Sequence, residues 1–496
     1  MRNLSKSKLM AYRQCPKRLW LEIHSKEPIT YSATAEASFK VGHSVGDIAR
    51  RLYDPKNKGA LIEPQIEGYQ QAIDRTATLL QSAQPIFEAG FSAGGALAFA
   101  DVMLPFKKGG KRVWRMIEVK SSASVKDYHL DDVAVQAFVA RNAGAALESI
   151  SLAHIDSEWV YPGNDNYDGL LVETDLSAEA FSRDSEVKTW IKEAQVVVKK
   201  TKEPAIGTGQ HCSKPYPCRF IDYCSAQEIQ AEYPAAWLPN VTAKKLTNFI
   251  ENEGIVDMSD IPDTLLSEQQ LRVKTHTLSD TAFFDAKGAA KDLAAHKLPA
   301  YFMDFETVKF AVPIWKGTRP YRQIPFQFSV QKLSRTRKLT EQSFLDLSGK
   351  NPAKGFAESL IAACGDKGAI FVYNAGFETA RIKELAAMFP RLSTSLLAIN
   401  ERVVDLLPIA RARYYHPSQQ GSWSIKAVLP AISDMSYEAL EGVQGGLMAM
   451  DAYRNAISPE ISQSEKLKIE QELIAYCGLD TLAMVKLWRF FTGQTD

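Results

Sequence analysis

The spacing of hydrophobic and polar residues predicts an α/β fold in the first part of the chain. Residues 39–53 place apolar side chains three and four positions apart, as in a helix that buries one face. Residues 86–105 and 113–119 have the apolar character of strands, and residues 131–141 return to helical spacing. This mixture indicates a sheet with helices packed on it.

The pattern changes twice further along the chain. Residues 228–296 contain short helical patterns interrupted by prolines and by Asn252-Glu-Gly254, without a convincing strand, which indicates a helical connector. From residue 297 onward strands and helices alternate again, which predicts a second α/β domain. The strands expected there cover residues 300–304, 324–345 with a turn, and 369–373, and the helices cover 377–388 and 469–491. We therefore expect domains at 1–227, 228–296 and 297–496.

Composition and charge exclude some classes of protein. The chain has 496 residues, of which 45% are hydrophobic and 24% charged, as in ordinary globular domains. A net charge of +1 excludes a globally basic nucleic-acid coat, although it says nothing about local patches. No apolar run approaches the roughly 18 residues of a membrane span, and the opening residues lack the apolar core of a signal peptide. We expect a cytoplasmic protein that does not contact membranes.

A first candidate site lies on the predicted strand at 113–119. The period of two along a strand places Glu118 and Lys120 on one face, and a turn at Gly109-Gly110 would bring Asp101 onto the neighbouring antiparallel strand. Two carboxylates can hold Mg²⁺ or Mn²⁺ while a lysine orients or polarises the water that attacks a phosphodiester. The alternative is a surface ion pair, because an acid two residues from a lysine is common in any chain.

Closely spaced cysteines indicate a second kind of site. Cys212, Cys218 and Cys224 fall within thirteen residues, among prolines and aromatic residues that suit a loop around a cofactor. Iron–sulfur and zinc are both open at this point, and zinc could also take His211 as a ligand. The two remaining downstream cysteines lie in apolar helical contexts, so we expect Cys364 and Cys477 in the core.

Four acidic residues mark a third site in the last domain. Asp304-Phe-Glu306 ends a predicted buried strand with both carboxylates on one face, and Glu378 follows another buried strand at the start of a helix. Tyr476 and Asp480 are one helical turn apart and share a face of the last helix. Together these side chains could build a two-metal site, and the alternative is a set of solvated carboxylates on helix surfaces.

The first block resembles the PD-(D/E)XK nucleases of the RecB type, in particular the CRISPR-associated exonucleases that carry an iron–sulfur cluster. The resemblance implies that Asp101 and Glu118 bind metal, that His43 is a further metal ligand, that Lys120 is catalytic and that Gln136 positions the substrate. These families often have an aromatic residue four positions after the glutamine, where this chain has Ala140. The matching elements are Cys15-Pro-Lys-Arg-Leu-Trp, Gly42-His43, Ala100-Asp101, Ile117-Glu118-Val-Lys120-Ser-Ser and Gln136.

The same resemblance supplies a fourth cysteine ligand. In RecB-type nucleases that carry a cluster, this ligand lies far upstream near the N-terminus, and Cys15 occupies that place here. The resemblance therefore implies a [4Fe–4S] cluster held by Cys15, Cys212, Cys218 and Cys224. We expect its role to be structural, because it closes a loop of roughly two hundred residues that would otherwise be entropically free.

Residues 297–496 resemble the DnaQ-like (DEDD) 3′–5′ exonucleases, which have an RNase H-like fold, in the subgroup whose last motif is tyrosine-x-x-x-aspartate. In that subgroup four acids hold two metal ions and the tyrosine orients the attacking water. The implied metal ligands are Asp304, Glu306, Glu378 and Asp480, and the implied orienting residue is Tyr476. Most members have an aspartate at the position of Glu378. Asp405 and the segment Trp423-Ser-Ile-Lys426 resemble the scaffold of that fold.

Both resemblances together cover essentially the whole chain and match a group of bacterial proteins that fuse the two nucleases. They imply a bifunctional metal-dependent nuclease that hydrolyses DNA, in repair, recombination or phage defence, with the protein partners of such a system left open. Two alternatives stay open at this point. One is an exonuclease that acts on RNA, and the other is a nucleic-acid-binding scaffold in which one or both nuclease folds are degenerate. Ala140 and Glu378 are the features that favour the scaffold.

Overall fold

The chain is a mixed α/β protein that divides into two compact units. The computed structural model describes residues 3–25 and 33–494, with only the backbone described for residues 33–35. The first unit comprises Met1–Glu228 and Phe310–Tyr321, and the second comprises Ile229–Lys309 and Arg322–Asp496. The segment expected as a separate connector, 228–296, is thus grouped almost entirely with the second unit. In the described residues, no helix is long and apolar enough to cross a membrane.

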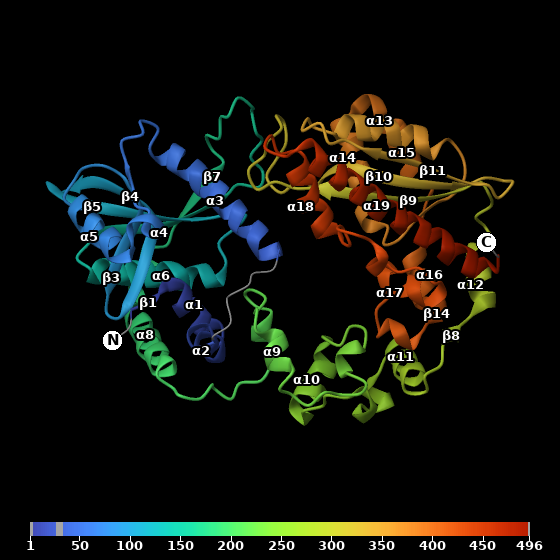
Figure 1. Ribbon diagram of the computed structural model, residues 1–496, viewed down its shortest axis with the longest axis horizontal. Helices are drawn as coiled ribbons and strands as arrows, with labels where there is room; N and C mark the ends of the chain where they lie inside the picture. The colour runs from blue at the N-terminus through green and yellow to red at the C-terminus, as the bar shows by residue number, and fades with distance from the viewer. Residues whose placement is uncertain (1–2, 26–32, 495–496) are drawn as a thin grey trace. The chain divides into compact units, whose positions relative to one another are not determined.

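A seven-stranded mixed sheet organises the first unit (Figure 1). Its strands follow the order β2-β3-β4-β5-β6-β7, and β1 pairs with β4. Neighbouring strands β3, β4 and β5 are antiparallel, whereas β5 and β6 are parallel. The strands are β1 Leu4–Ser5, β2 Ala60–Leu61, β3 Ile86–Ala93, β4 Ala96–Lys108, β5 Lys111–Lys120, β6 Leu147–Ile155 and β7 Leu171–Asp175.

Helices cover both faces of this sheet. Helix α6 is buried along most of its length and packs with α1 and α8 over one face, where Trp114 and Met116 point. Ile117 and Val102 point to the opposite face, where α3 contacts β4 and β5. The helices are α1 Lys6–Gln14, α2 Pro16–His24, α3 Ala33–Tyr53, α4 Pro64–Glu67, α5 Tyr69–Leu79, α6 Asp127–Asn142, α7 Ser177–Ser182, α8 Asp184–Val198 and α9 Ile221–Ser225.

The hairpin of β4 and β5 has the two-residue turn that the sequence predicts. Gly109 and Gly110 both have positive φ, at 55° and 77°, as a type I′ turn requires. The register pairs Val102 with Ile117, so Asp101 and Glu118 follow as neighbours on adjacent strands. The predicted antiparallel placement of these two acids is confirmed.

Residues Phe310–Tyr321 pack into the first unit although they lie between strands of the second unit in the sequence. The backbone of Tyr161 exchanges hydrogen bonds with this segment, including one from the Gly317 N–H at 2.8 Å. The Tyr321 hydroxyl donates to the carbonyl of Ser121, next to Lys120. The sequence analysis assigned the whole of 297–496 to one domain, because a short segment that crosses between units leaves no periodic signal.

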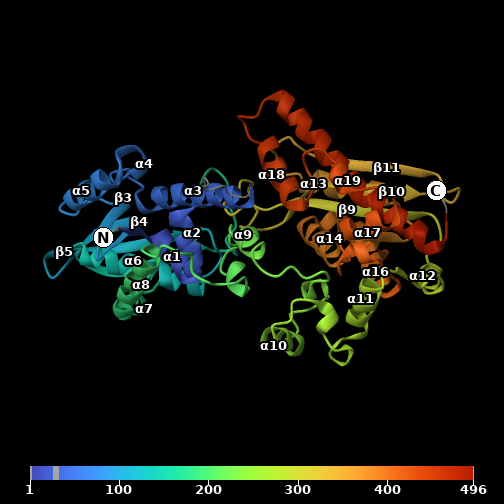
Figure 2. The same cartoon turned by 60° about the horizontal axis from the view of Figure 1, so that its bottom comes forward.

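A five-stranded mixed sheet, in the order β11-β10-β9-β12-β13, organises the second unit. Figure 2 shows β9, β10 and β11 side by side with α19 running along them, and α19 contacts all three strands. Helix α13 contacts β10 and β11, and Phe356 from α13 meets Phe305 of β9. The strands are β9 Ala300–Val308, β10 Ile324–Leu333, β11 Leu339–Leu345, β12 Ile370–Val372 and β13 Val403–Asp405.

The helices of the second unit include the two predicted from periodicity, α14 and α19. Asp405 accepts hydrogen bonds from the backbone N–H groups of Asn374 and Ala375 and caps α16, which fits the scaffold role expected for it. The helices are α10 Lys244–Glu253, α11 Glu268–Leu278, α12 Ala286–Leu293, α13 Ala353–Cys364, α14 Gly376–Met388, α15 Ser393–Asn400, α16 Leu406–Arg413, α17 Ile425–Ile432, α18 Gly446–Ala456 and α19 Gln463–Thr492.

Two details of the predicted secondary structure are wrong. Strand β9 does not end at Asp304 but continues to Val308, because its antiparallel pairing with β10 extends to Val308. A strand also lies within the supposed helical connector, where β8 (Phe283–Phe284) pairs with β14 (Tyr414–Tyr415). A two-residue strand is too short to show alternation, so only its distant partner reveals it.

Candidate metal centres and the cysteine cluster

Three carboxylates converge in the second unit. Asp304 and Glu306 lie two residues apart on β9 and face α19, which carries Asp480. Their oxygens lie within 4.8 Å of one another, and in the part of the chain that the structure describes no other group of three metal-ligating side chains is as close. Strand β12 pairs with β9 only at Tyr301 and Phe302, so the two β9 acids lie beyond the end of β12.

Mutual repulsion and burial shift the protonation of these acids. Burial and the neighbouring acids raise the pKa of Asp304 well above its usual value. Burial and Asp480 raise the pKa of Glu306 to about 8, and burial raises the pKa of Asp480 to about 6. A site that binds protons this strongly is short of positive charge, and a hard divalent cation with oxygen ligands would meet that need.

Glu378 lies beside the three acids but not within their compact group. It is in the first turn of α14 with its side chain buried, and its Oε2 has no hydrogen-bond partner. Burial, together with Asp405, raises the pKa of Glu378 to about 7, and its charge in turn raises the pKa of Asp304 and Glu306. A buried carboxylate oxygen without a partner is costly, which suits a residue that receives a cation or a proton.

Two buried tyrosines lie beside Asp480, one of which the sequence did not indicate. The Tyr437 hydroxyl donates to Asp480 over 2.5 Å, and the ring centre of Tyr476 lies 6.3 Å from that of Tyr437. Burial and the charge of Asp480 raise the pKa of both phenols far above their usual value. Each phenol is therefore a hydrogen-bond donor at neutral pH.

Lys426 provides a positive charge at the edge of the acidic group. Its Nζ lies 5.0 Å from the ring centre of Tyr476 and 5.2 Å from that of Tyr437, and it donates to the carbonyl of Gln444. It lowers the pKa of Glu306 and Asp480, although no ion pair joins it to either acid. The sequence showed Lys426 only as part of a scaffold segment, because no spacing rule connects it to acids on β9 and α19.

In the first unit, the predicted residues form a network of charges. Lys120 Nζ lies 2.6 Å from Glu118 Oε1 and 2.5 Å from Asp132 Oδ2. Lys6 Nζ lies 2.8 Å from the same Glu118 oxygen and 3.1 Å from Asp132. Burial alone would lower the pKa of Lys120, but Asp132 and Glu118 raise it well above its usual value. Sequence reasoning missed Lys6, whose partner Glu118 lies 112 positions away.

Asp101 and Glu118 stand in different environments within this network. Asp101 accepts a hydrogen bond from the Val119 N–H at 2.6 Å, and burial and Glu118 raise its pKa well above the usual value. Gln136 donates to Glu118 Oε2 at 2.5 Å and to the carbonyl of Phe99 at 3.1 Å. Gln136 is fully buried and therefore positions Glu118 here, whereas the resemblance implied that it positions substrate.

His43 lies at the same cavity as the network. A cavity of about 630 Å³ is lined by His43 from α3, by Asp101, Glu118 and Lys120, and by Lys6. His43 is not part of a compact group of metal-ligating atoms in the described residues. The position where related nucleases often have an aromatic residue, Ala140, is buried in the core.

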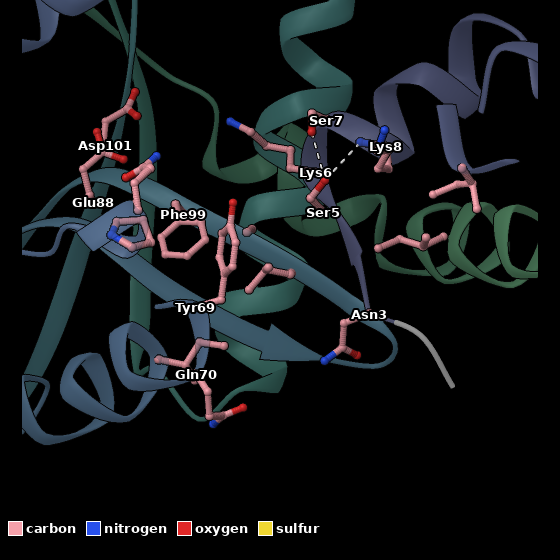
Figure 3. A pocket seen from close by; sticks show the side chains of 17 residues that line it. Asn3, Ser5, Lys6, Ser7, Lys8, Tyr69, Gln70, Glu88, Phe99 and Asp101 are labelled. Atoms are coloured by element: carbon pink, nitrogen blue, oxygen red, sulfur yellow. Dashed lines mark hydrogen bonds between the residues drawn. The ribbon is translucent and has the colours of Figure 1, made fainter. Parts of the chain in front are cut away.

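Glu88 adds an acid that the sequence did not indicate. It lies in β3 between the pairs Phe87–Val102 and Ala89–Ala100, so it stands opposite Asp101. Its φ of 55° is unusual for a residue other than glycine, and such strain is common at functional sites. Figure 3 shows the carboxyl groups of Glu88 and Asp101 next to each other at a second cavity. The sequence alone does not mark Glu88 as a site residue, because Glu88 lies within an otherwise apolar strand pattern.

The four predicted cluster cysteines gather in the first unit. Burial raises the pKa of Cys218 and of Cys224. Cys15 and Cys212 add to the rise at Cys218, and Cys15, Cys212 and Cys218 add to the rise at Cys224. All are free thiols, and all but Cys224 are buried. The segment that carries Cys15 is joined to the 211–224 loop by the Gln14 side chain, which donates to the carbonyls of His211 and Tyr216, each over 2.7 Å.

The described residues do not group the four sulfurs as a compact metal site, since no three of the Sγ atoms lie within 4.8 Å of one another. Cys364 and Cys477 are fully buried in the second unit, which confirms their core position.

Comparison with known protein families gives a partial match. Residues 301–424 match a family model described as a domain of unknown function, DUF2779. The matched range includes Asp304, Glu306 and Glu378 but ends before Tyr476 and Asp480. No curated protein matches the chain.

Proposed function

We propose that the protein is a metal-dependent nuclease with one hydrolytic site in each unit. The observation that carries the proposal is the convergence of Asp304, Glu306 and Asp480 within 4.8 Å, beside the unpartnered Glu378 Oε2. Their hard oxygen donors fit Mg²⁺ or Mn²⁺. When bound, such a cation supplies Lewis acidity to water and neutralises phosphate charge.

The remaining residues of the second site have complementary roles. The protonated phenol of Tyr476 donates its one hydrogen bond to the water and orients it, and Glu378, with a pKa of about 7, accepts the proton that this water loses. Lys426 offers positive charge to a phosphate oxygen. The water oxygen forms a bond to phosphorus as the P–O bond to the leaving oxygen breaks, and that oxygen takes up a proton. The products are one phosphomonoester and one hydroxyl.

The first site uses a lysine where the second uses a tyrosine. Lys120 lies at the cavity with Asp101, Glu118, Glu88 and His43, so its ammonium can orient water while the acids hold the cation. Asp132 keeps that ammonium charged and aimed. We expect DNA as the substrate, in the cytoplasm, in a repair or defence pathway.

We propose further that Cys15, Cys212, Cys218 and Cys224 hold a [4Fe–4S] cluster that ties the N-terminal helices to the 211–224 loop. The gathered free thiols and the hydrogen bonds of Gln14 support it. Anaerobically purified protein should be brown and contain about four irons per chain. Stoichiometric zinc without iron would refute this assignment.

Digestion of end-labelled single- and double-stranded DNA and RNA, with Mg²⁺ and with Mn²⁺, tests the nuclease proposal. We expect wild type to cleave, Lys120→Ala and Asp304→Ala each to remove part of the activity, and the double variant to be inactive. A double variant as active as wild type would refute the proposal. Activity on RNA alone would replace DNA as the substrate.

A further inference from the structure

A cavity of about 770 Å³ in the first unit leads away from the candidate metal centre (Figure 3). Asp101, Glu88 and Lys6 line both this cavity and the one that contains His43, so the acids lie where the two meet. Beyond them the wall becomes aromatic and amide-rich. A substrate phosphate at Asp101 would therefore have space beside it for the rest of a nucleotide.

Two aromatic rings form the wall next to the acids. Tyr69, the first residue of α5, is 58% exposed, and its ring centre lies 5.9 Å from that of Phe99 with the planes tilted by 55°. Figure 3 shows the two rings side by side, with Glu88 and Asp101 on one side and the Ser5–Lys8 segment on the other. Phe99 is only two residues from Asp101 on β4, about 7 Å along the strand.

The local backbone is arranged to keep the Phe99 ring in this place. Gly90 pairs with Phe99 across β3 and β4, and a Cβ on Gly90 would approach the Phe99 ring to 2.7 Å. The Gly90 N–H is held by the Thr76 hydroxyl of α5 at 2.9 Å, which fixes the helix that carries Tyr69. The absence of a side chain at Gly90 thus leaves room for the Phe99 ring at the cavity wall.

The exposed ring is part of a wider feature. Ile66 on α4 is 79% exposed and lines the neighbouring cavity, and Pro64 and Gln65 line both cavities. Single exposed apolar residues are ordinary on a protein surface. Here, however, an exposed ring, a second ring beside it and an exposed amide all border the space next to the acids. Flat rings and amides are the groups that recognise nucleobases.

We propose that this cavity is a subsite for one unpaired nucleobase, which stacks on Tyr69 while the adjoining phosphate lies at Asp101. This inference rests on the proposed nuclease function of the first unit and specifies its substrate, because a base paired within a duplex cannot leave the stack without an energetic cost. The first site would then act on single-stranded segments or ends.

The test uses the full chain with Asp304→Asn, which silences the second site. Variants Tyr69→Ala and Tyr69→Phe are compared with Phe106→Ala, a matched control because Phe106 is also exposed but lies outside both cavities. Substrates are single-stranded oligonucleotides, intact or with one abasic position moved along the strand. Both KM for cleavage and the dissociation constant in Ca²⁺, which needs no turnover, are measured.

We expect Tyr69→Ala to weaken single-strand binding and raise KM by roughly 5- to 150-fold, the range expected for loss of one stacked base. Tyr69→Phe and Phe106→Ala should stay within about twofold of wild type. At one position along the strand, removal of the base should weaken oligonucleotide binding by wild type but not by Tyr69→Ala. A tyrosine with a merely structural role would not produce this difference.

Two results would overturn the subsite. One is unchanged binding of single strands by Tyr69→Ala. The other is that, at every position tested, an abasic site weakens binding by Tyr69→Ala as much as it weakens binding by wild type. The two proposals fail in different ways. If Lys120→Ala removes cleavage while Tyr69→Ala binds normally, the nuclease stands and the subsite is refuted. If no cleavage depends on Lys120, the nuclease function of this unit is refuted, and the Ca²⁺ binding series still decides whether Tyr69 stacks a base.

Discussion

The two candidate metal centres differ in how their acids are balanced. In the first unit, Lys6 and Lys120 both contact Glu118 and Asp132, so protein cations offset protein anions. In the second unit, the acids lie near Lys426, which lowers the pKa of Glu306 and Asp480 but forms no ion pair with either. The proposed metal ion would have to displace an existing ammonium from Glu118 in the first site, whereas in the second it would fill a deficit of charge.

The difference bears on how each site would take up the proposed metal ion. In the first site, acids and lysines already balance one another, so a cation would have to compete with lysine. In the second site the acids bind protons instead, so the proposed metal affinity should increase with pH. The following predictions test this contrast, first through activity, where large effects are expected, and then through stability, where they are small.

The largest effect should follow from removing the central acid of the second site. In a Lys120→Ala background, Asp304→Asn should lower the remaining nuclease rate by on the order of 10³-fold or more, because the cation loses an anionic ligand. Rates at saturating Mn²⁺ measure it. Cys364→Ser, a buried position outside the acidic group, controls for general damage to the unit. Equal loss in both variants would contradict a specific metal site.

Tyr476→Phe should slow the same reaction by on the order of 10²-fold, as expected for loss of an orienting hydrogen bond. Tyr437→Phe is the matched comparison, because Tyr437 is also buried beside Asp480 and donates a hydrogen bond to it, but is not on the same helix. If only Tyr476 faces the water, Tyr437→Phe should affect Mn²⁺ affinity more than the rate at saturation. Equal rate losses would mean that both phenols act through Asp480 alone.

Glu378 provides the next comparison. Glu378→Ala should abolish the activity that survives Lys120→Ala, whereas Glu378→Asp should retain roughly a tenth or more of it, since the charge is kept. Single-turnover rates distinguish the two variants. If Glu378→Ala has no effect while Asp304→Ala is inactive, Glu378 is neither a ligand nor a proton acceptor, and Asp405 becomes the next carboxylate to test.

The smallest effect concerns stability without metal. The pKa values of Glu306 and Glu378 are raised to about 8 and about 7, so between pH 5 and 8 the folded state holds more protons than the unfolded state. The free energy of unfolding in EDTA should therefore fall as pH rises through this window. We expect a decrease in Tm of roughly 5 °C. Calorimetry of wild type and Glu306→Gln measures it, and the variant should show a shallower decrease.

Addition of Mn²⁺ should reverse that decrease, and more strongly at pH 8 than at pH 5, because binding displaces protons. The same titration on the first unit's transition should show a smaller pH dependence, since Glu118 and Asp132 are already paired with lysines and the raised pKa values there belong to Asp101 and Glu88. A pH-independent Tm in EDTA would contradict the charge deficit of the second site.

The sequence predicted secondary structure better than it predicted which distant residues contact one another. The hairpin carrying Asp101 and Glu118 and the helix carrying Tyr476 and Asp480 follow from periods of two and 3.6. Periodicity placed the end of β9 too early, because the pairing of Val308 with Ile324 is a tertiary fact and not a local pattern.

The residues missed at both sites share one cause. Lys6, Tyr437 and Lys426 reach their acids across long separations in the chain, 112 positions for Lys6 and Glu118 and 43 for Tyr437 and Asp480. No periodic rule connects such pairs. Glu88 was missed for another reason, because its role depends on a backbone angle that an otherwise regular strand sequence does not reveal.

The segment Phe310–Tyr321 determines what happens when the chain is cut. A protease nick after Glu228 would yield two fragments. The C-terminal fragment would still carry the strap formed by Phe310–Tyr321, whose Tyr321 hydroxyl donates to the Ser121 carbonyl next to Lys120. A gene truncated after Glu228 would lose that strap altogether. The first half expressed alone should thus be impaired at its own lysine, and mixing the separately made halves should restore it in the manner of fragment complementation.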